Sequence, residues 1–433
     1  MAQTATPMPR PFRADFDRLQ QARREPGFLR RLREDGMAHF EQLGLPHRKL
    51  ESWRFTDLSA FAERSFAHAG ATPVDAARLP GVLATGGLRL VFVNGRYNPA
   101  LSESSPLPEG IVVCSLGEAL ERHPARLEAE LGHTAGPADH AFAALNDALL
   151  DDGVYIHVAA GKHLEAPVEL VHYTTGEGTA SYPRNLVVLD EAAQISVVED
   201  HRGQGEYFAC PQTEIRLGPG AVCRYHKLQQ EAAGAWHLGT LRLQQARDSQ
   251  FSAHLLSAGG RLNRTDILAR LEGEGADCGL HGLTLVEDGE LADYHVRVEH
   301  AQPHGSSRQL FRSVLNGRSR AVFDGLIKVV EQAQKTDASQ TCRNLLLSPR
   351  ALAHANPRLE ILADDVKCAH GATVGFLDRD ALFYLRSRGV GAAEARAMLV
   401  FAFANELFET LTVPALRERL EALLVERYYP AGL

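Results

Sequence analysis

The first part of the chain has apolar positions at helical spacing, followed by strand-like runs. Between residues 15 and 42, apolar side chains recur every three or four positions, with an interruption near Pro26 and a stop at Gly44-Leu-Pro. This pattern predicts two short helices. Apolar runs at residues 88–93, which an Asn-Gly turn follows, and at residues 111–114 predict strands. This region is therefore expected to be a mixed α/β unit.

Near residue 153 the pattern changes to a succession of short alternating segments separated by Gly, Pro, Asp and Asn. Such segments are typical of β-strands with one buried face. Long amphipathic helical patterns are missing between them, which argues against a doubly wound sheet. The predicted strands lie at residues 155–158, 168–173, 186–189, 195–199, 221–228, 238–243, 278–285, 294–298, 322–329 and 359–362.

A weak internal repeat runs through these segments. A turn, a small residue and a strand recur from Asp190, Gly218, Arg247 and Gly273, at steps of roughly 28 residues, a repeat length found in solenoids. The pattern restarts after a longer gap at Asn316. We interpret it as a parallel β-helix, in which each coil is too small to bury its own core and stacks on its neighbours. A β-sandwich is the competing architecture.

The last part of the chain returns to helical periodicity. The pattern predicts helices at residues 380–388, which Gly389 ends, at residues 392–411, and from Pro414 to residue 424. The fold class is therefore mainly β with flanking helical regions. We divide the chain into an N-terminal helical and α/β region (residues 1–145), a parallel β-helix core (residues 146–378) and a C-terminal helical domain (residues 379–433).

Composition narrows the classes of partner. With 45% hydrophobic and 23% charged residues the chain is an ordinary globular protein, and its net charge of −8 gives no basic surface for nucleic acid or an anionic membrane. The N-terminus has no apolar run of the kind a signal peptide needs, and no segment approaches the ~20 apolar residues of a membrane span. We therefore expect a cytoplasmic protein.

Several common catalytic and cofactor motifs are missing from the sequence. The six cysteines include no Cys-x-x-Cys pair, which argues against a zinc ribbon, a ferredoxin-type site or a disulfide framework. There is no Gly-x-x-x-x-Gly-Lys-[Ser/Thr], Gly-x-Ser-x-Gly or His-Glu-x-x-His. We therefore expect a protein that is not an enzyme and that does not bind ATP in the P-loop manner.

Several long motifs resemble the SufB/SufD family of iron–sulfur cluster assembly scaffold proteins. The resemblance covers roughly residues 140–410 and implies a right-handed parallel β-helix between an N-terminal α/β region and C-terminal helices. Cys368-Ala-His-Gly has the form found in the SufD branch, and a SufB-like paralogue is the alternative. The motifs are Ala144-Leu-Asn-Asp-Ala-Leu, Asp152-Gly-Val-Tyr-Ile-His-Val, Ser307-Arg-Gln-Leu-Phe-Arg-Ser, Gln334-Lys-Thr-Asp-Ala, Arg343-Asn-Leu-Leu-Leu-Ser, Pro357-Arg-Leu-Glu-Ile-Leu-Ala and Phe383-Tyr-Leu-Arg-Ser-Arg-Gly-Val.

This resemblance implies a scaffold subunit of a SufBCD complex, with no bond-making chemistry of its own. It implies pairing with SufB through the end of the β-helix, and binding of the SufC ATPase through the C-terminal helices. The candidate SufC contacts are Phe383, Tyr384, Arg386 and Arg388. An iron–sulfur cluster or iron would be held transiently in the complex, with no cofactor bound stably by the chain alone. In isolation the chain is a candidate homodimer.

Cys368 and His370 are the leading candidate metal ligands. They are two residues apart on a predicted strand, so their side chains point to the same side, and thiolate and imidazole both bind iron. In a β-solenoid such a pair also occurs for packing alone, and Val366 has the same parity. The family resemblance favours ligation for His370, which it places at the SufB contact where the cluster forms.

Other polar groups have simpler explanations. Asp364 and Asp365 are interpreted as a turn rather than an iron site. His295, His300 and His304 are interpreted as structural or surface residues, with His295 on a solvent face.

Cys342 replaces the asparagine that is usual in SufD relatives, whereas SufB carries a functional cysteine in a similar setting. The residue is either small apolar packing or a spare thiolate near His370 on an adjacent strand. We include it among the candidate ligands.

A rival of a different class is a β-helix enzyme that acts on polysaccharide, such as a lyase. Such enzymes bind extended sugars in a cleft lined by acidic and basic residues and usually work outside the cell, and the expected lack of a signal peptide argues against this rival.

Overall fold

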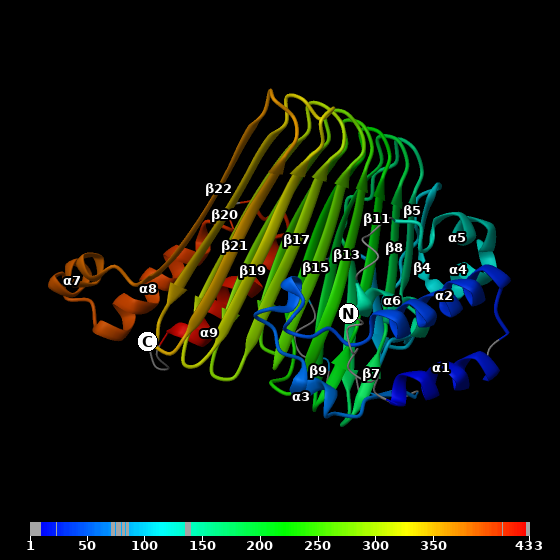
Figure 1. Cartoon of the computed structure of the whole chain (residues 1–433), viewed down its shortest axis with the longest axis horizontal. Helices are drawn as coiled ribbons and strands as arrows, with labels where there is room; N and C mark the ends of the chain where they lie inside the picture. Colours follow the sequence, from blue (N-terminus) through cyan, green and yellow to red (C-terminus); the bar gives the residue numbers. More distant parts are fainter. Residues whose placement is uncertain are drawn as a thin grey trace.

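Two β-sheets face each other and form a parallel β-solenoid at the centre of the molecule (Figure 1). The computed structural model describes residues 10–22, 24–70, 74, 79, 83, 86–134, 140–408 and 410–429; residues 1–9, at which a signal peptide would begin, lie outside this set. The first sheet contains β5 (Val154–Val158), β8 (Arg184–Leu189), β11 (Gln212–Leu217), β13 (Trp236–Gln245), β15 (Leu262–Leu271), β17 (Leu291–His300), β19 (Arg320–Val329) and β21 (Leu352–Ile361). The second sheet contains β6 (Val168–Thr175), β9 (Gln194–Gln204), β12 (Val222–Gln230), β14 (Gln250–Ala258), β16 (Asp277–Val286), β18 (Ser306–Leu315), β20 (Asp337–Leu346) and β22 (Lys367–Phe376).

The strand register explains the internal repeat of the sequence. In the second sheet Val222 pairs in parallel with Gln250, and Gln250 pairs with Asp277, so that one coil takes 28 and then 27 residues. Ser306 pairs with Asp337, a coil of 31 residues, which is why the repeat loses its spacing toward the C-terminus. Each coil gives one strand to each sheet, which confirms the β-helix and excludes the β-sandwich.

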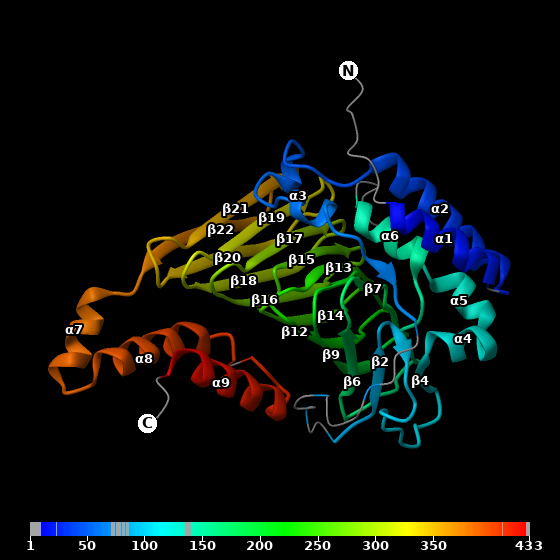
Figure 2. The ribbon, with the colours of Figure 1, turned by 90° about the horizontal axis from the view of Figure 1, so that it is seen from below.

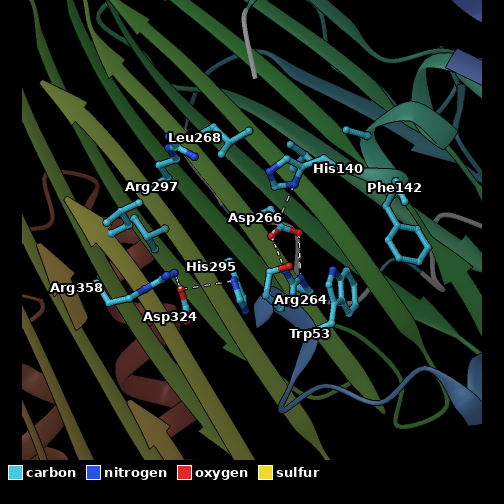
Figure 3. Close-up of a pocket in the computed structure, with 16 residues that line it drawn as sticks. Trp53, His140, Phe142, Arg264, Asp266, Leu268, His295, Arg297, Asp324 and Arg358 are labelled. Carbon is cyan, nitrogen blue, oxygen red and sulfur yellow. Dashed lines mark hydrogen bonds and ion pairs between the residues drawn. The ribbon is translucent and has the colours of Figure 1, made fainter. Parts of the chain in front are cut away.

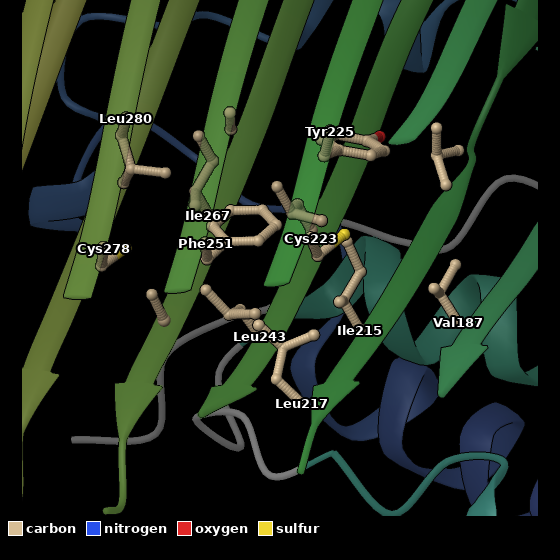
Figure 4. Packing of buried hydrophobic residues seen from close by; sticks show 14 of the residues in the cluster. Val187, Ile215, Leu217, Cys223, Tyr225, Leu243, Phe251, Ile267, Cys278 and Leu280 are labelled. Carbon is tan, nitrogen blue, oxygen red and sulfur yellow. The ribbon is translucent and has the colours of Figure 1, made fainter. Parts of the chain in front are cut away.

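Apolar side chains from both sheets fill the interior of the solenoid (Figure 4). Cys223, Phe251 and Cys278 occupy one register position on three successive strands of the second sheet, opposite Ile267 of the first sheet. Alternate residues of each strand point inward, which is the periodicity that the sequence shows. No coil buries this surface alone, so stability comes from stacking.

Helices and short strands of the N-terminal region cover the side and one end of the solenoid. The two predicted helices are confirmed as α1 (Arg10–Ala22) and α2 (Gly27–Leu43), and α2 ends at Gly44, whose φ of 66° suits glycine. The remaining elements are η1 (Glu51–Trp53), α3 (Ser59–Ala62), β1 (Ala67–His68), β2 (Arg89–Val93), β3 (Arg96–Tyr97), β4 (Ile111–Ser115), α4 (Leu116–Arg122), α5 (Pro124–Glu130) and α6 (Ala141–Leu149), with α6 spanning the predicted domain boundary.

The N-terminal end of the solenoid is closed by strands from the same chain. The predicted strand at residues 88–93 and the Asn-Gly turn after it are confirmed: β2 and β3 are antiparallel, and Asn94 and Gly95 have φ values of 51° and 77° in the turn between them. β2 extends the second sheet beside β6, and β4 extends the first sheet beside β5. The short strands β1, β7 (Thr179–Ser181) and β10 (Tyr207–Ala209) pair with one another at the edge of the first sheet.

The C-terminal domain consists of α7 (Arg379–Ser387), α8 (Ala392–Asn405) and α9 (Pro414–Tyr428), and α8 and α9 lie against the second sheet (Figure 2). The second predicted helix ends at Asn405 rather than at residue 411, because the chain turns there and buries Leu407 and Phe408 against the sheet. The apolar stripe of these helices therefore covers the outer face of the solenoid. None of the helices in the described ranges is long and apolar enough to cross a membrane.

Candidate functional site

The C-terminal end of the solenoid is uncovered. β21 and β22 are the last strands of their sheets, and in the described part of the chain no further strand pairs with their outer edges. The free backbone groups of such an edge are ready to pair with another chain. Large apolar side chains are exposed around it: Leu352, Ile361, Leu362, Val374 and Phe376, of which Phe376 is 62% exposed. We call the last coil, β21 and β22, the open end (at the left of the solenoid in Figures 1 and 2).

Cys368 and His370 lie on β22, on the face that points to the interior in earlier coils. Their register partners on β20 are Ala338 and Gln340, both buried. Within the described residues no coil covers β22, so this inward face is accessible at the open end. Cys368 is half-buried beside Ala338, and burial raises the pKa of its thiol, whereas His370 is exposed. The structure therefore brings the two predicted ligands together on one accessible face.

Cys342 lies one coil deeper. It is fully buried in the main core with Phe311 and Phe323, and its register partner on β22 is Ala372, one inward position from His370. The expected neighbourhood on adjacent strands is therefore confirmed. The Asn344 side chain donates a 3.4 Å hydrogen bond to its sulfur, and burial raises the pKa of the thiol to about 11. Without a bound metal the residue is therefore a neutral thiol at neutral pH.

The acidic pair before β22 forms the predicted turn. Asp365 makes an ion pair with Lys335 of the preceding coil, and its backbone N–H donates to the Gln334 side chain at 2.9 Å. Both contacts are between neighbouring turns of the solenoid, so the role of Asp365 is structural.

The three histidines of residues 295–304 also have structural or surface positions. His300 is fully buried, with its Nε2 2.8 Å from the Ser307 hydroxyl, and His304 is exposed in a turn. His295 points outward from the first sheet, but its side chain is only 13% exposed, so the predicted solvent face was wrong. Residues before and within α6 and around η1 cover this part of the sheet.

His295 lines a cavity of about 130 Å³ between the N-terminal region and the outer face of the first sheet (Figure 3). The Arg264 guanidinium lies 3.7 Å from the centre of the Trp53 ring and pairs with Asp266 at 2.8 Å. Burial opposes ionisation of Asp266, but Arg264 outweighs it and lowers the pKa of Asp266 to about 2. Asp324, on the other side of His295, pairs with Arg358. These acidic and basic side chains neutralise one another, and Arg264 holds η1 of the N-terminal region on the outer face of the first sheet.

A second polar cluster lies inside the solenoid and was not predicted from the sequence. The atoms of His172, Glu199 and His201 that could bind a metal lie within 4.8 Å of one another. The pKa of His172 is lowered to about 3, mainly by burial and next by the nearby His201. One Glu199 oxygen accepts from Thr213 and Tyr225, each at 2.7 Å, and the other lies 2.6 Å from His201 Nε2. Protein donors therefore satisfy the carboxylate without a metal. The only sequence signal is the 29-residue spacing of the histidines, which the register places side by side.

The candidate partner-binding residues lie on and just after α7. No residue of this helix is buried, and Phe383 and Tyr384 are 74% and 58% exposed. The Arg388 guanidinium lies 5.3 Å from the centre of the Tyr384 ring and donates to its hydroxyl, and Arg386 lies in the last turn. The helix therefore presents an aromatic and basic surface beyond the open end.

Two family models together match most of the chain. The SufBD protein N-terminal region matches residues 13–170, and the SufBD core domain of the SUF system for iron–sulfur cluster assembly matches residues 172–403. The match therefore begins well before residue 140, where the sequence motifs begin.

Similar curated proteins point to the same family. The iron–sulfur cluster assembly protein SufD of Escherichia coli is 33% identical over 91% of this chain and 92% of its own length. A SufBD family protein of Synechocystis is 32% identical over 87% of the chain and 86% of its own length, and the chloroplastic protein ABCI7 of Arabidopsis thaliana is 28% identical over 90% and 84%. The extent of these matches shows that this chain belongs to the SufB/SufD family of iron–sulfur cluster assembly proteins.

Proposed function

We propose that this chain is the SufD-type scaffold subunit of a cytoplasmic SufBCD complex. It pairs with a SufB-type partner through the open end and binds a SufC-type ATPase through the C-terminal domain. His370, with Cys368 beside it, contributes a ligand to iron or to the nascent cluster, which is the cargo of the complex. The chain itself makes and breaks no bonds, and ATP hydrolysis is the task of the partner.

The uncapped last coil, which carries His370 and Cys368 on its accessible inward face, is the observation that carries this proposal. A solenoid that ends without a cap leaves a row of backbone donors and acceptors and an apolar rim, which a second solenoid can cover by strand pairing. Imidazole and thiolate at that junction are established ligand types for cluster iron. All six cysteines are free thiols, as is typical of a reducing compartment.

Two features support the partner assignments. The exposed aromatic residues of α7 fit a helix that docks on another protein, because Tyr and Arg are frequent at the energetic centres of interfaces. The open end is also complementary to itself as a strand edge, so in the absence of a SufB-type partner a second copy of this chain would occupy it.

The test replaces His370 with alanine in cells that depend on this chain for cluster assembly. We expect client iron–sulfur enzymes to lose activity while pull-downs still recover both partners, because an exposed imidazole contributes little to the fold. His304→Ala, which removes an exposed histidine far along the chain from β22, is the matched control. Full client activity in His370→Ala cells would contradict the ligand role.

A further inference from the structure

One interior column of the second sheet changes from apolar to polar as it approaches the open end. The register aligns Leu280, Gln309, Gln340 and His370 on successive strands. Leu280 is an ordinary core residue, but the two glutamines are only 2% and 1% exposed. Burial of two amides is costly unless they are hydrogen-bonded, so the column is a polar ladder built beneath His370.

The Gln340 side chain is held in one orientation. Its Nε2 donates a 2.8 Å hydrogen bond to Gln309 Oε1 of the coil below. The amide also lies against Gly325 of the first sheet, where an added Cβ would be 2.2 Å from Gln340 Nε2. A side chain larger than glycine at residue 325 would therefore push the amide aside, which shows how closely the interior is shaped around Gln340.

The carbonyl oxygen of Gln340 has no hydrogen-bond donor among the described residues, although it is buried. Since the Nε2 of this amide is bound to the coil below, the Oε1 is the group of this side chain that is left for a further partner. The inward side chain at the same register position of β22 is His370, one strand spacing of ~4.8 Å away. An unpartnered buried acceptor is destabilising, and an imidazole N–H at this place would satisfy it.

We propose that Gln340 is a positioning residue for His370: its Oε1 accepts a hydrogen bond from one ring N–H and thereby fixes the tautomer of the imidazole. The other ring nitrogen then keeps its lone pair and is free to bind iron at the open end. Metal-binding histidines generally use their second nitrogen in this way, to a carboxylate or carbonyl oxygen. The inference rests on the proposed ligand role of His370, whereas the hydrogen bond itself does not depend on it.

The hydrogen bond is tested on the full chain by ¹⁵N NMR of labelled histidine, with the His370 signals assigned from His370→Ala. We expect one dominant tautomer in the wild type. Gln340→Met keeps the length of the side chain without an acceptor and should change the tautomer ratio severalfold, whereas Gln340→Glu keeps an acceptor and should preserve it. Thr341→Val, on the same strand but facing outward, is the matched control. An unchanged ratio in Gln340→Met overturns the proposal.

The positioning role is tested by cluster retention in the complex reconstituted with its SufB- and SufC-type partners. Loss of such an outer hydrogen bond typically lowers metal affinity ~10–100-fold, so we expect at least a tenfold faster loss of cluster from Gln340→Met and near-normal retention in Gln340→Glu. A changed tautomer with unchanged retention overturns the positioning role. Unchanged retention in His370→Ala overturns the ligand role instead, and the tautomer ratio still decides whether Gln340 holds the ring.

Discussion

The two ends of the solenoid are built differently. At the N-terminal end every residue of β5 and all but the last of β6 are buried, because β4 and the β2–β3 hairpin extend the two sheets and α6 packs nearby. At the open end most of β22 is exposed, although its sequence alternates as in any other coil. The same repeating unit is thus a core element at one end and a surface at the other.

This difference shows how one fold separates stability from partner binding. An unprotected edge strand usually carries charges or proline that prevent association, and Pro357 and Arg358 on β21 are of this kind. β22 has Lys367 as its only charged residue and ends in an exposed phenylalanine. A strand with so little protection is expected to be covered in the working complex.

The largest effect on the free energy of unfolding should come from a core substitution at the N-terminal end of the solenoid, the capped end, which β2 and β4 close. Phe92 of β2 is fully buried, so Phe92→Ala should lower the free energy of unfolding by about 3–5 kcal/mol. Phe376→Ala at the open end should change it by less than about 0.5 kcal/mol in the isolated monomer, since surface substitutions have small effects. Chemical denaturation of both variants measures the contrast. Equal losses would show that the open end is packed like the capped end.

A charge on the inward face of β22 should block pairing. Val374 is 49% exposed and takes an inward position, so Val374→Lys would place an unpaired charge inside any strand-paired interface. We expect about 100-fold weaker association, ~2.8 kcal/mol, with a SufB-type partner or a second copy. Thr373→Lys, on the outward face of the same strand, is the control. Sedimentation should show dimers for the control and monomers for Val374→Lys, and dimers of both would exclude this interface.

Much of the fold is visible in the sequence, but some coils are hidden by their polar interiors. β11, β15, β18 and β20 were not predicted as strands. In β20 the inward positions include Gln340 and Asn344, and in β18 they include Gln309 and Ser313, so the usual apolar-inside pattern is broken. Hydrogen bonds between coils offset part of the cost of burying them, as in the bonds from Gln340 to Gln309 and from Asn344 to the Thr373 backbone. Single-strand periodicity cannot show such pairing, because it depends on the register between coils.

The candidate site could be predicted only in part, because the sequence shows which residues share a strand face but not how the coils stack. Strand parity alone places Cys368 and His370 on one side. That this side is accessible depends on the absence of a covering coil, which is a tertiary property. Likewise, His172 and His201 meet only because one coil takes 29 residues between them.

A smaller effect is expected where the C-terminal domain meets its partner. Because α7 buries no residue of its own, Phe383→Ala with Tyr384→Ala should leave unfolding unchanged and weaken binding of a SufC-type ATPase by about 2 kcal/mol. Titration calorimetry and thermal unfolding separate the two effects. Truncation after residue 378 would be a poorer test, since it uncovers Leu228, Leu256 and Leu283 on the second sheet. Wild-type affinity in the double variant would place the contact elsewhere.

The smallest effect concerns Cys342, just beneath the open end. Its burial and the raised pKa of about 11 favour packing over ligation, so Cys342→Val, which has a similar volume and no sulfur, should retain clusters within about twofold of the wild type. Cys342→Ala should lower the free energy of unfolding by about 1 kcal/mol through the space it leaves. Equal and large cluster loss in both variants would instead identify the sulfur as a ligand.

The pH dependence of unfolding gives an independent check on this cysteine. The folded pKa of Cys342 is about 11, above the ~8.5 of a free thiol, so the stability gained by keeping it neutral is fully present below pH ~8.5 and is lost as the pH rises toward 11. The wild type should therefore lose its stability advantage over Cys342→Ala in this range, and the other buried cysteines cancel in the comparison.

In the native protein at pH 8, alkylation should reach the half-buried Cys368 well before Cys342. Fast alkylation of Cys342 would show that the last coil opens, so that even the second coil from the open end behaves as surface.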